Sequence, residues 1–166
     1  MTNMNELEFV NYVQINDMIA TSGQLNDQQI KFISNQGYTT IINLAPHTAQ
    51  DTLPEEGKIV ASNFMTYINI PVLYEDPQID QLKMFCAVMS TLAEQKVWIH
   101  CAKNTRVAAF VYLFQRYEQK VSHHEALSEM FKKWTPDDTW LEFFEEAETH
   151  FFSITRYKRR PQAMVA

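Results

Sequence analysis

The residues of this chain with the clearest chemical potential are Cys101 and Arg106, which are separated by the four residues Ala102 to Thr105. A short apolar, β-rich run ends at His100, and an apolar helical pattern begins at Arg106. This order predicts a strand, a tight loop and a helix, so loop N–H groups and the positive end of the helix dipole share one site. Such a site favours a thiolate, and an arginine can hold a tetrahedral oxyanion through two parallel hydrogen bonds. The stretch therefore predicts a nucleophile at the mouth of an anion-binding loop.

A structural role is the alternative for Cys101, because buried cysteine is common as a small hydrophobe. The spacing to Arg106, the strand–loop–helix setting and the preceding His100 favour a functional role. Cys86 provides the contrast, since it falls on the apolar face of a predicted helix and has no basic neighbour. We therefore predict a core residue at Cys86.

The composition of the 166-residue chain predicts one globular domain, because 46% of the residues are hydrophobic and 13% are aromatic. A formal net charge of −6 argues against general nucleic-acid binding. No apolar run approaches the roughly 20 residues that a membrane span needs, and the first residues carry no secretory signal. With two cysteines and no signal, the expectation is a cytoplasmic protein with reduced thiols.

The elements that must position the cysteine loop alternate between strands and helices over residues 15–118. Strands are predicted at 15–21 (as an edge strand), 38–44, 64–72 and 96–100, and helices at 27–36, 54–62, 78–94 and 106–118. The alternation predicts an α/β fold with a mostly parallel central sheet of four to five strands and helices on both faces. The cysteine loop then lies at the carboxyl end of a strand, where ligands bind in open α/β sheets.

The ends of the chain differ from this pattern. We predict a single domain over residues 1–166, with a loosely ordered lead-in at residues 1–14 and a basic tail at residues 153–166. Extra helices are predicted at the C-terminal side: an amphipathic helix spanning Leu127 to Trp134, and a last helix that begins with Thr135 as its cap and Pro136 at its first position.

No group of residues predicts a metal site. His123 and His124 are adjacent, so in a helix they point about 100° apart, which is typical of solvated surface. The acidic residues of the last helix likewise predict a solvated face.

The pair His100-Cys101 with Arg106 before an apolar helix resembles the signature loop of the cysteine-dependent protein tyrosine and dual-specificity phosphatases. Earlier stretches support this resemblance: Thr21-Ser22-Gly23-Gln24, Ile41-Ile42-Asn43-Leu44, Glu55-Glu56-Gly57 and Tyr67 to Val72. Over roughly residues 10–150 the chain is similar to the small bacterial phosphatase-like proteins of this superfamily, a group also found fused to a metallo-β-lactamase-like hydrolase.

The resemblance implies metal-independent hydrolysis of a phosphomonoester, without a cofactor, through a phosphocysteine at Cys101. It implies a phosphorylated substrate or a phosphate- or sulfate-like anion as partner, bound by the loop residues Cys101, Ala102, Lys103, Asn104, Thr105 and Arg106. The family takes its general acid from the loop after the preceding strand, where Asp76 is the best match and Glu75 the substitute. The alternative for Asp76 is an N-cap, with Pro77 at the first helical position.

Three features depart from the phosphatase pattern. The family normally has five residues between Cys and Arg, includes a glycine there, and has Ser or Thr where this chain has Val107. A gap of four residues is also the loop length of rhodanese-like sulfurtransferases, which carry a persulfide on the cysteine. Three hypotheses therefore stay open: a phosphatase, which the flanking chain favours; a sulfurtransferase acting through a Cys101 persulfide; and a non-catalytic phosphate-binding module.

Overall fold

The computed structural model of the protein describes residues 7–49 and 51–159, with side chains up to residue 153. Its centre is a five-stranded sheet in the order β1-β2-β5-β3-β4. The strands are β1 (Val13–Gln14), β2 (Ile19–Ser22), β3 (Thr40–Asn43), β4 (Thr66–Asn69) and β5 (Val97–His100). Only the β1–β2 pair is antiparallel, so the prediction of a mostly parallel α/β sheet is confirmed.

The register of the sheet sets polar residues side by side at its carboxyl edge. His100, the last residue of β5, pairs with Ser22 on one side and with Asn43 on the other, and Asn43 pairs with Asn69 of β4. The inner positions of the same strands are apolar and buried, as in Ile42 and Ile99. The sheet thus brings a polar row to the end where its loops carry the cysteine.

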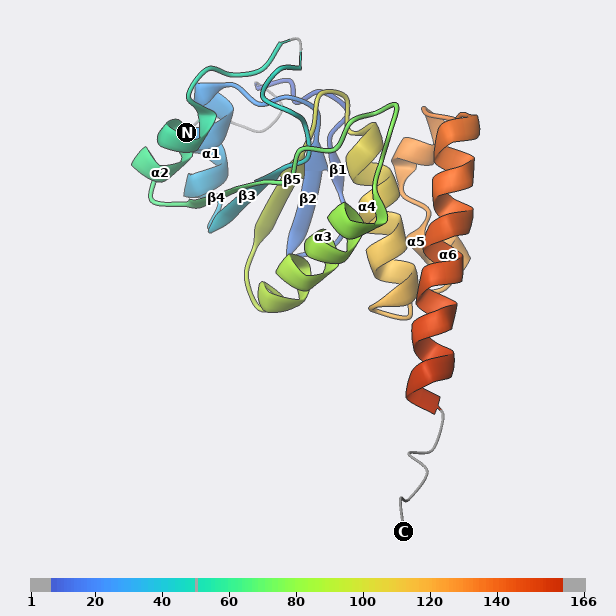
Figure 1. The fold of residues 1–166 in the computed structure, drawn as a ribbon. Helices are drawn as coiled ribbons and strands as arrows, with labels where there is room; N and C mark the ends of the chain where they lie inside the picture. Colours follow the sequence, from blue (N-terminus) through green and yellow to red (C-terminus); the bar gives the residue numbers. More distant parts are fainter. Residues whose placement is uncertain (1–6, 50, 160–166) are drawn as a thin grey trace.

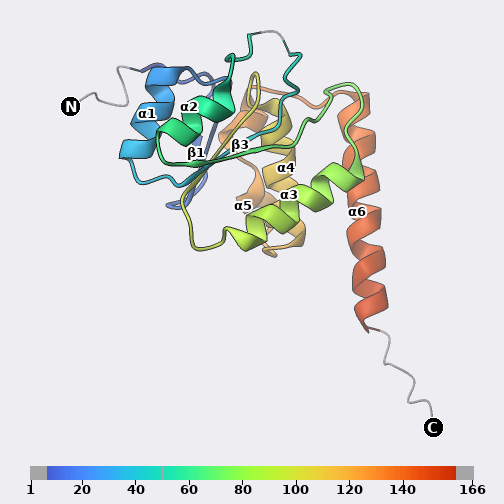
Figure 2. The same cartoon turned by 60° about the vertical axis from the view of Figure 1, so that its left-hand side comes forward.

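Helices cover both faces of the sheet, as predicted (Figure 1). On one face lie α1 (Asp27–Asn35) and α2 (Glu56–Ser62), packed on a cluster that includes Ile41 and Trp98. On the other lie α3 (Ile79–Thr91), α4 (Thr105–Tyr117) and α6 (Asp138–Arg159), and Figure 2 shows α3 and α6 on this side from a second angle. Because α4 is buried between the sheet and α6, the loop before it is anchored at its helical end.

Helix α1 follows from its sequence signals. Asn26 and Gln29 form the predicted capping box, in which each side chain accepts a hydrogen bond from the other residue's backbone N–H. Gly37 follows the helix with a φ of +82°, a conformation that glycine adopts without steric cost. Both ends of α1 are therefore set by local chemistry.

The predicted lead-in is structured where the structure describes it. Residues 13–14 form the edge strand β1, so β2 is not an edge strand, and it begins at Ile19 rather than at residue 15. The backbone of Gly23 donates to the Val10 carbonyl at 2.7 Å, which ties the segment before β1 to the turn after β2. Residues 1–6 of the predicted lead-in lie outside the described part.

The C-terminal region differs most from the prediction. The helix predicted over Leu127 to Trp134 is instead α5 (His123–Ala126) and a 3₁₀ helix, η2 (Glu129–Lys132), because Leu127 and Ser128 are extended. The last helix begins at Asp138, and its start is capped by the Asp137 carboxylate, which accepts from the Trp140 N–H at 3.2 Å. Helix α6 continues to Arg159 through the first half of the predicted basic tail, and residues 160–166 lie outside the described part.

None of the described helices is both long and apolar enough to cross a membrane. Within the same residues, no cluster of three or more His, Cys, Asp or Glu side chains could hold a metal ion.

Candidate active site

The cysteine loop joins β5 to α4 at the carboxyl edge of the sheet, where the sequence placed it. Cys101 follows β5 directly, and α4 begins at Thr105 with Asn104 as its N-cap residue. The N-terminal residues of α4 therefore face the loop, and Arg106 is the second residue of the helix.

Asn104 takes a left-handed backbone conformation within the loop. Its φ of +67° is left-handed, and asparagine is among the few residues that adopt this region readily. Its side chain is fully buried and donates to the Asn11 carbonyl at 2.7 Å and to Thr21 Oγ1 at 3.0 Å. The absence of a glycine from the loop is thus compensated by an asparagine that also bonds to the N-terminal segment.

The carbonyl groups of the loop all point outward to partners. The Cys101 carbonyl faces His100 Nδ1 at 3.4 Å, the Ala102 carbonyl accepts from the Gln24 N–H at 3.0 Å, and the Lys103 carbonyl accepts from Asn11 Nδ2 at 3.0 Å. In a trans peptide the C=O and the next N–H point in opposite directions, so the N–H groups that follow face the inside of the loop. Among the described residues, none accepts a hydrogen bond from the N–H groups of residues 102–106.

Arg106 is a buried cation without an anionic partner in the described part of the chain. Its exposed fraction is 8%, one terminal nitrogen donates to the Val72 carbonyl at 2.8 Å, and its Nε has no partner. Burying an uncompensated charge is costly. The guanidinium and the free N–H groups together therefore form a site that an oxyanion would complete.

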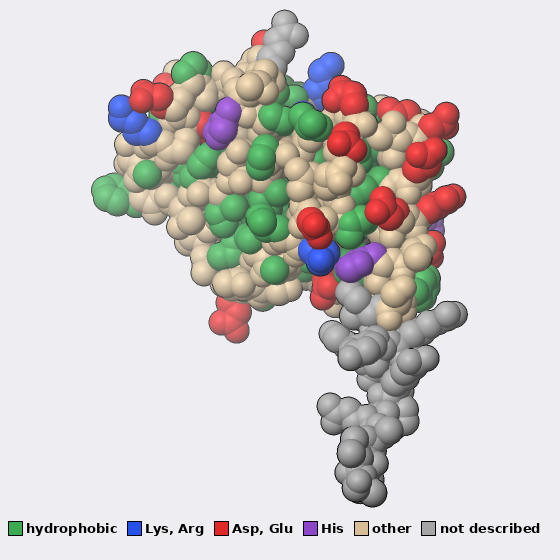
Figure 3. All heavy atoms as spheres, viewed as in Figure 1, with side chains coloured by type: hydrophobic (Ala, Val, Ile, Leu, Met, Phe, Trp, Pro, Cys, Tyr) green, Lys and Arg blue, Asp and Glu red, His purple; other side chains and the backbone are tan. Residues whose placement is uncertain are grey.

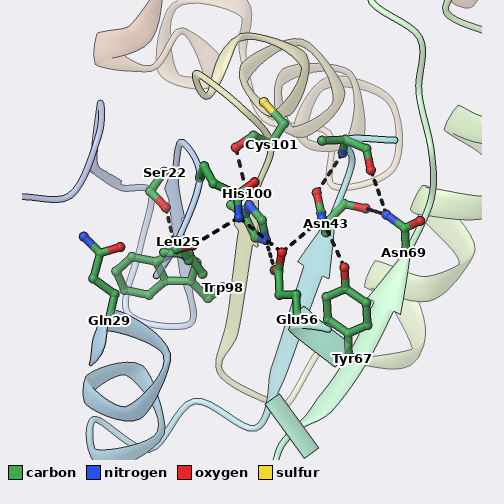
Figure 4. Close-up of polar contacts among 12 residues, drawn as sticks. Ser22, Leu25, Gln29, Asn43, Glu56, Tyr67, Asn69, Trp98, His100 and Cys101 are labelled. Carbon is green, nitrogen blue, oxygen red and sulfur yellow. Dashed lines mark hydrogen bonds and ion pairs between the residues drawn. The ribbon is translucent and has the colours of Figure 1, made fainter. Parts of the chain in front are cut away.

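Cys101 lies deeper than the sequence predicted. Its exposed fraction is 0%, and it belongs to the apolar cluster between the sheet and α3, α4 and α6, rather than to an open loop mouth. Figure 4 shows the sulfur pointing away from His100 while the Cys101 carbonyl points toward it. The thiol and the imidazole therefore lie on opposite sides of the backbone at Cys101.

A buried polar network lies beneath the loop, and sequence reasoning missed it. The Glu56 side chain contacts His100 Nε2 and accepts from Gln24 Nε2 at 3.2 Å and from Asn43 Nδ2 at 3.5 Å (Figure 4). Asn43 also donates to the Tyr67 hydroxyl at 3.1 Å. Burial and then the Glu56 charge raise the pKa of Tyr67 to about 12, against a smaller lowering effect of the Asn43 hydrogen bond.

One stretch of the sequence bears on that network. Glu56 is one of two acids at the start of a predicted helix, a place where acids usually face solvent and the helix dipole. Helix α2 instead begins at Glu56 with its side chain buried, while Glu55 is exposed and pairs with Lys58. The stretch Glu55-Glu56-Gly57 was part of the family resemblance, and this was the only sign that one of the two acids lies inside.

Asp76 and Glu75 are exposed residues of the turn between β4 and α3. The Asp76 carboxylate accepts from Gln78 Nε2 at 2.6 Å, and none of its hydrogen bonds within the described residues reaches the cysteine loop. The N-cap alternative for Asp76 is wrong, because Gln78 is the N-cap of α3 in a capping box with Gln81. Asp76 instead holds the side chain of this N-cap residue.

The remaining candidates have the surroundings that the sequence predicted. Cys86 is buried on α3, and burial followed by the charge of Glu118 raises the pKa of its thiol to about 12. Acidic side chains gather on the outer face over α6 in Figure 3, and Glu142, Glu145, Glu146 and Glu148 are all exposed. These glutamates thus form the predicted solvated face.

A family model described as "DSP-PTPase phosphatase fused to NAD+ Kinase" matches residues 7–147. The chain belongs to this family, and so to the cysteine-dependent protein tyrosine and dual-specificity phosphatase superfamily that the sequence resembles. The family description names a different fusion partner from the metallo-β-lactamase-like hydrolase of the resemblance. No curated protein matches the chain.

Solved structures with the same fold include phosphatases. A candidate phosphatase (DUF442) from Shewanella putrefaciens CN-32 is 27% identical, with a TM-score of 0.78 over 86% of this chain and 94% of that one. PTPMT1 in complex with PI(5)P is 14% identical, with a TM-score of 0.71 over 87% and 98% of the two chains. Pseudomonas aeruginosa TpbA in complex with pTyr is 12% identical, with a TM-score of 0.58 over 71% and 70%. The last two likenesses concern the fold alone.

Proposed function

We propose that this protein is a metal-independent phosphomonoester hydrolase that acts through a phosphocysteine at Cys101. The observation that carries the proposal is the buried Arg106 beside the free N–H groups of residues 102–106, a site that lacks only an oxyanion. Membership of the phosphatase superfamily supports the choice of a phosphoryl group as that oxyanion.

In the proposed reaction the Cys101 thiolate attacks phosphorus in line with the leaving oxygen. The S–P bond forms as the P–O bond breaks, while Arg106 and the loop N–H groups stabilise the equatorial oxygens. Asp76 donates its proton to the leaving oxygen, with Glu75 as the substitute. Water then attacks the phosphocysteine and gives a proton to the Asp76 carboxylate. The S–P bond breaks, and inorganic phosphate and the Cys101 thiolate are released.

The first experiment compares the two cysteines with an aryl phosphate as the probe. The Cys101→Ser variant should lose hydrolysis, because an alcohol at this position is a far weaker nucleophile than a thiolate. Cys86→Ser is the matched control and should stay active, since Cys86 lies on α3 away from the loop. Wild-type activity in Cys101→Ser would end the proposal.

The second experiment tests the acid. With an alkyl phosphate, whose leaving oxygen needs a proton, Asp76→Asn should lower kcat by about 10²–10⁴-fold. Glu75→Gln, the same change one residue earlier, should leave kcat near wild type. The reverse result would assign the acid to Glu75, and two unaffected variants would remove the acid from this turn.

A non-catalytic phosphate-binding module is the second candidate, favoured by the full burial of Cys101 and by Val107 in place of a hydroxyl residue. It predicts that inorganic phosphate binds with no Cys101-dependent turnover. Sulfur transfer, favoured by the loop length, predicts one added sulfur on Cys101 by mass spectrometry after thiosulfate treatment. Hydrolysis that depends on Cys101, without this added mass, would exclude both.

The substrate is proposed to be a phosphorylated molecule, in line with the pTyr and PI(5)P bound by the two distant neighbours. We place the reaction in the cytoplasm, because Cys86 and Cys101 are both free thiols.

A further inference from the structure

His100 and Glu56 are both buried and touch each other directly beneath the nucleophile. The exposed fractions of their side chains are 0% and 3%. A buried acid–base pair is expensive to desolvate. The position of this pair under Cys101 therefore indicates a role in addition to packing.

The Glu56 side chain is surrounded by donors. Gln24 and Asn43 each direct a side-chain NH₂ group at one carboxylate oxygen, while His100 Nε2 meets the other. Hydrogen bonds donated to a carboxylate favour its ionised form. As an anion, Glu56 can only accept hydrogen bonds, so the hydrogen of its contact with His100 would be on the ring.

The second ring nitrogen of His100 faces an atom that can only accept. Nδ1 lies 3.4 Å from the Cys101 carbonyl oxygen, so it must carry a hydrogen to make this bond. A hydrogen on both nitrogens makes the ring an imidazolium, whose charge an ionised Glu56 would balance. Tyr67 is linked to this pair through Asn43, and Cys101 follows His100 directly in the chain.

We propose that Glu56 is a positioning residue that acts through His100. It keeps the ring doubly protonated, so that Nδ1–H holds the Cys101 carbonyl on the underside of the loop and the Ala102 N–H faces the anion. It also keeps a positive charge next to the residue that must become a thiolate. The inference rests on the proposed function, because it assigns Glu56 to the preparation of the same nucleophile.

The test measures the thiolate itself rather than turnover. The ultraviolet absorbance of a thiolate is followed against pH, and the signal of Cys101 is taken as the difference from Cys101→Ser. In Glu56→Gln the midpoint of this titration should rise by about one pH unit or more, because His100 loses the anion that stabilises its charged form, and with it the positive charge beside Cys101. Glu55→Gln is the matched control: it removes a carboxylate one residue away whose side chain is exposed, and the midpoint should stay at its wild-type value.

A double mutant tests whether the effect of Glu56 on the Cys101 titration depends on His100. Asparagine at position 100 can still donate to the Cys101 carbonyl but is too short to reach Glu56. The Glu56→Gln shift should therefore disappear when it is made together with His100→Asn, as a double-mutant cycle requires of two coupled residues. A shift of undiminished size in this background would overturn the route.

A purely structural role gives a different result. Glu56→Gln would then melt at a lower temperature while the Cys101 midpoint stayed at its wild-type value, and this outcome overturns the inference alone. If the wild-type midpoint equals that of an ordinary thiol, near 8.5, the proposed nucleophile fails and the inference falls with it. The two failures are thus distinguishable.

A measurement on the wild type covers the case in which Glu56→Gln does not fold. Nitrogen NMR of the histidine rings separates a doubly protonated ring from either neutral tautomer, and the His100→Asn spectrum identifies the signal of His100. At neutral pH both His100 nitrogens should carry hydrogen. One bare nitrogen on His100 would overturn the inference.

Discussion

Both cysteines of this protein are buried in the same apolar cluster, but the polar groups around them differ. Burial raises the pKa of the Cys86 thiol on α3 to about 12. Cys101 directly follows β5, and its loop has five N–H groups without a partner among the described residues, a guanidinium that bonds only to the Val72 carbonyl, and an imidazole under the Cys101 carbonyl. Burial alone therefore does not determine the reactivity of a thiol, because the dipoles and charges buried beside the thiol also affect it.

The largest expected effect comes from Arg106, because Cys86 has no such cation beside it. Arg106→Lys keeps the charge but loses the planar fork, so kcat/KM for an aryl phosphate should fall by about 10²–10³-fold. Arg116→Lys is a close control on the same helix, because Arg116 also donates to one carbonyl, that of Val121, and also has an unpartnered Nε. Equal losses in the two variants would mean that Arg106 acts through the stability of α4.

An intermediate effect is expected where the N-terminal segment approaches the loop. A Cβ at Gly23 would lie 2.6 Å from the Ala102 carbonyl oxygen and 2.7 Å from a Val10 side-chain carbon. Because a backbone oxygen cannot give way easily, Gly23→Ala should cost about 1–3 kcal/mol of unfolding free energy and weaken phosphate binding. Urea unfolding and calorimetry with inorganic phosphate measure the two effects.

Gly57→Ala is the control for that variant, since the nearest atom to its added Cβ belongs to the Tyr67 ring, at 2.9 Å. A side chain can move, so we expect a smaller loss of stability and unchanged phosphate binding. The same loss of binding in both variants would contradict the special role of the Gly23 contact.

The smallest effect concerns Cys86. Its folded-state pKa of about 12 lies above the ordinary value, so its stabilising contribution is complete below about pH 9. That contribution is lost as the pH rises toward 12, because the unfolded thiol ionises first. The slope of unfolding free energy against pH above 9 should therefore be shallower in Cys86→Ala than in wild type, at a cost of about 1 kcal/mol at neutral pH.

Tyr67 and Tyr117, whose pKa values are also raised to about 12, are present in both proteins and cancel in that comparison. Urea titrations at several pH values give the two slopes. Parallel curves would show that the Cys86 thiol does not titrate differently in the folded and unfolded states.

The sheet and the cysteine loop could be predicted because their signals are local. β-branched residues in β3 and β5, the capping box of α1 and the spacing from Cys101 to Arg106 each lie within a few residues. The C-terminal break at Leu127 could not be predicted, since its apolar residues keep helical spacing. Met130 packs in a cluster with Val13 and Ala108, and this tertiary contact competes with local helical preference.

The site was predictable only in part for a related reason. The burial of Glu56 depends on His100, which lies 44 positions later in the chain. The N-cap alternative for Asp76 starts α3 two residues too early, because Gln78 forms the capping box with Gln81 instead. A contact between residues so far apart, such as Glu56 and His100, leaves no periodic pattern in the sequence.

The bonds between Asn11 and the loop link residues 92 and 93 positions apart. Closing so long a stretch of chain has a high entropic cost, so contacts of this kind tend to form late in folding. During synthesis, Asn11 must wait for Asn104 to emerge from the ribosome before it can brace the anion-binding turn. The protein would thus complete its reactive centre only once the central strand β5, which ends directly before the loop, has also been made.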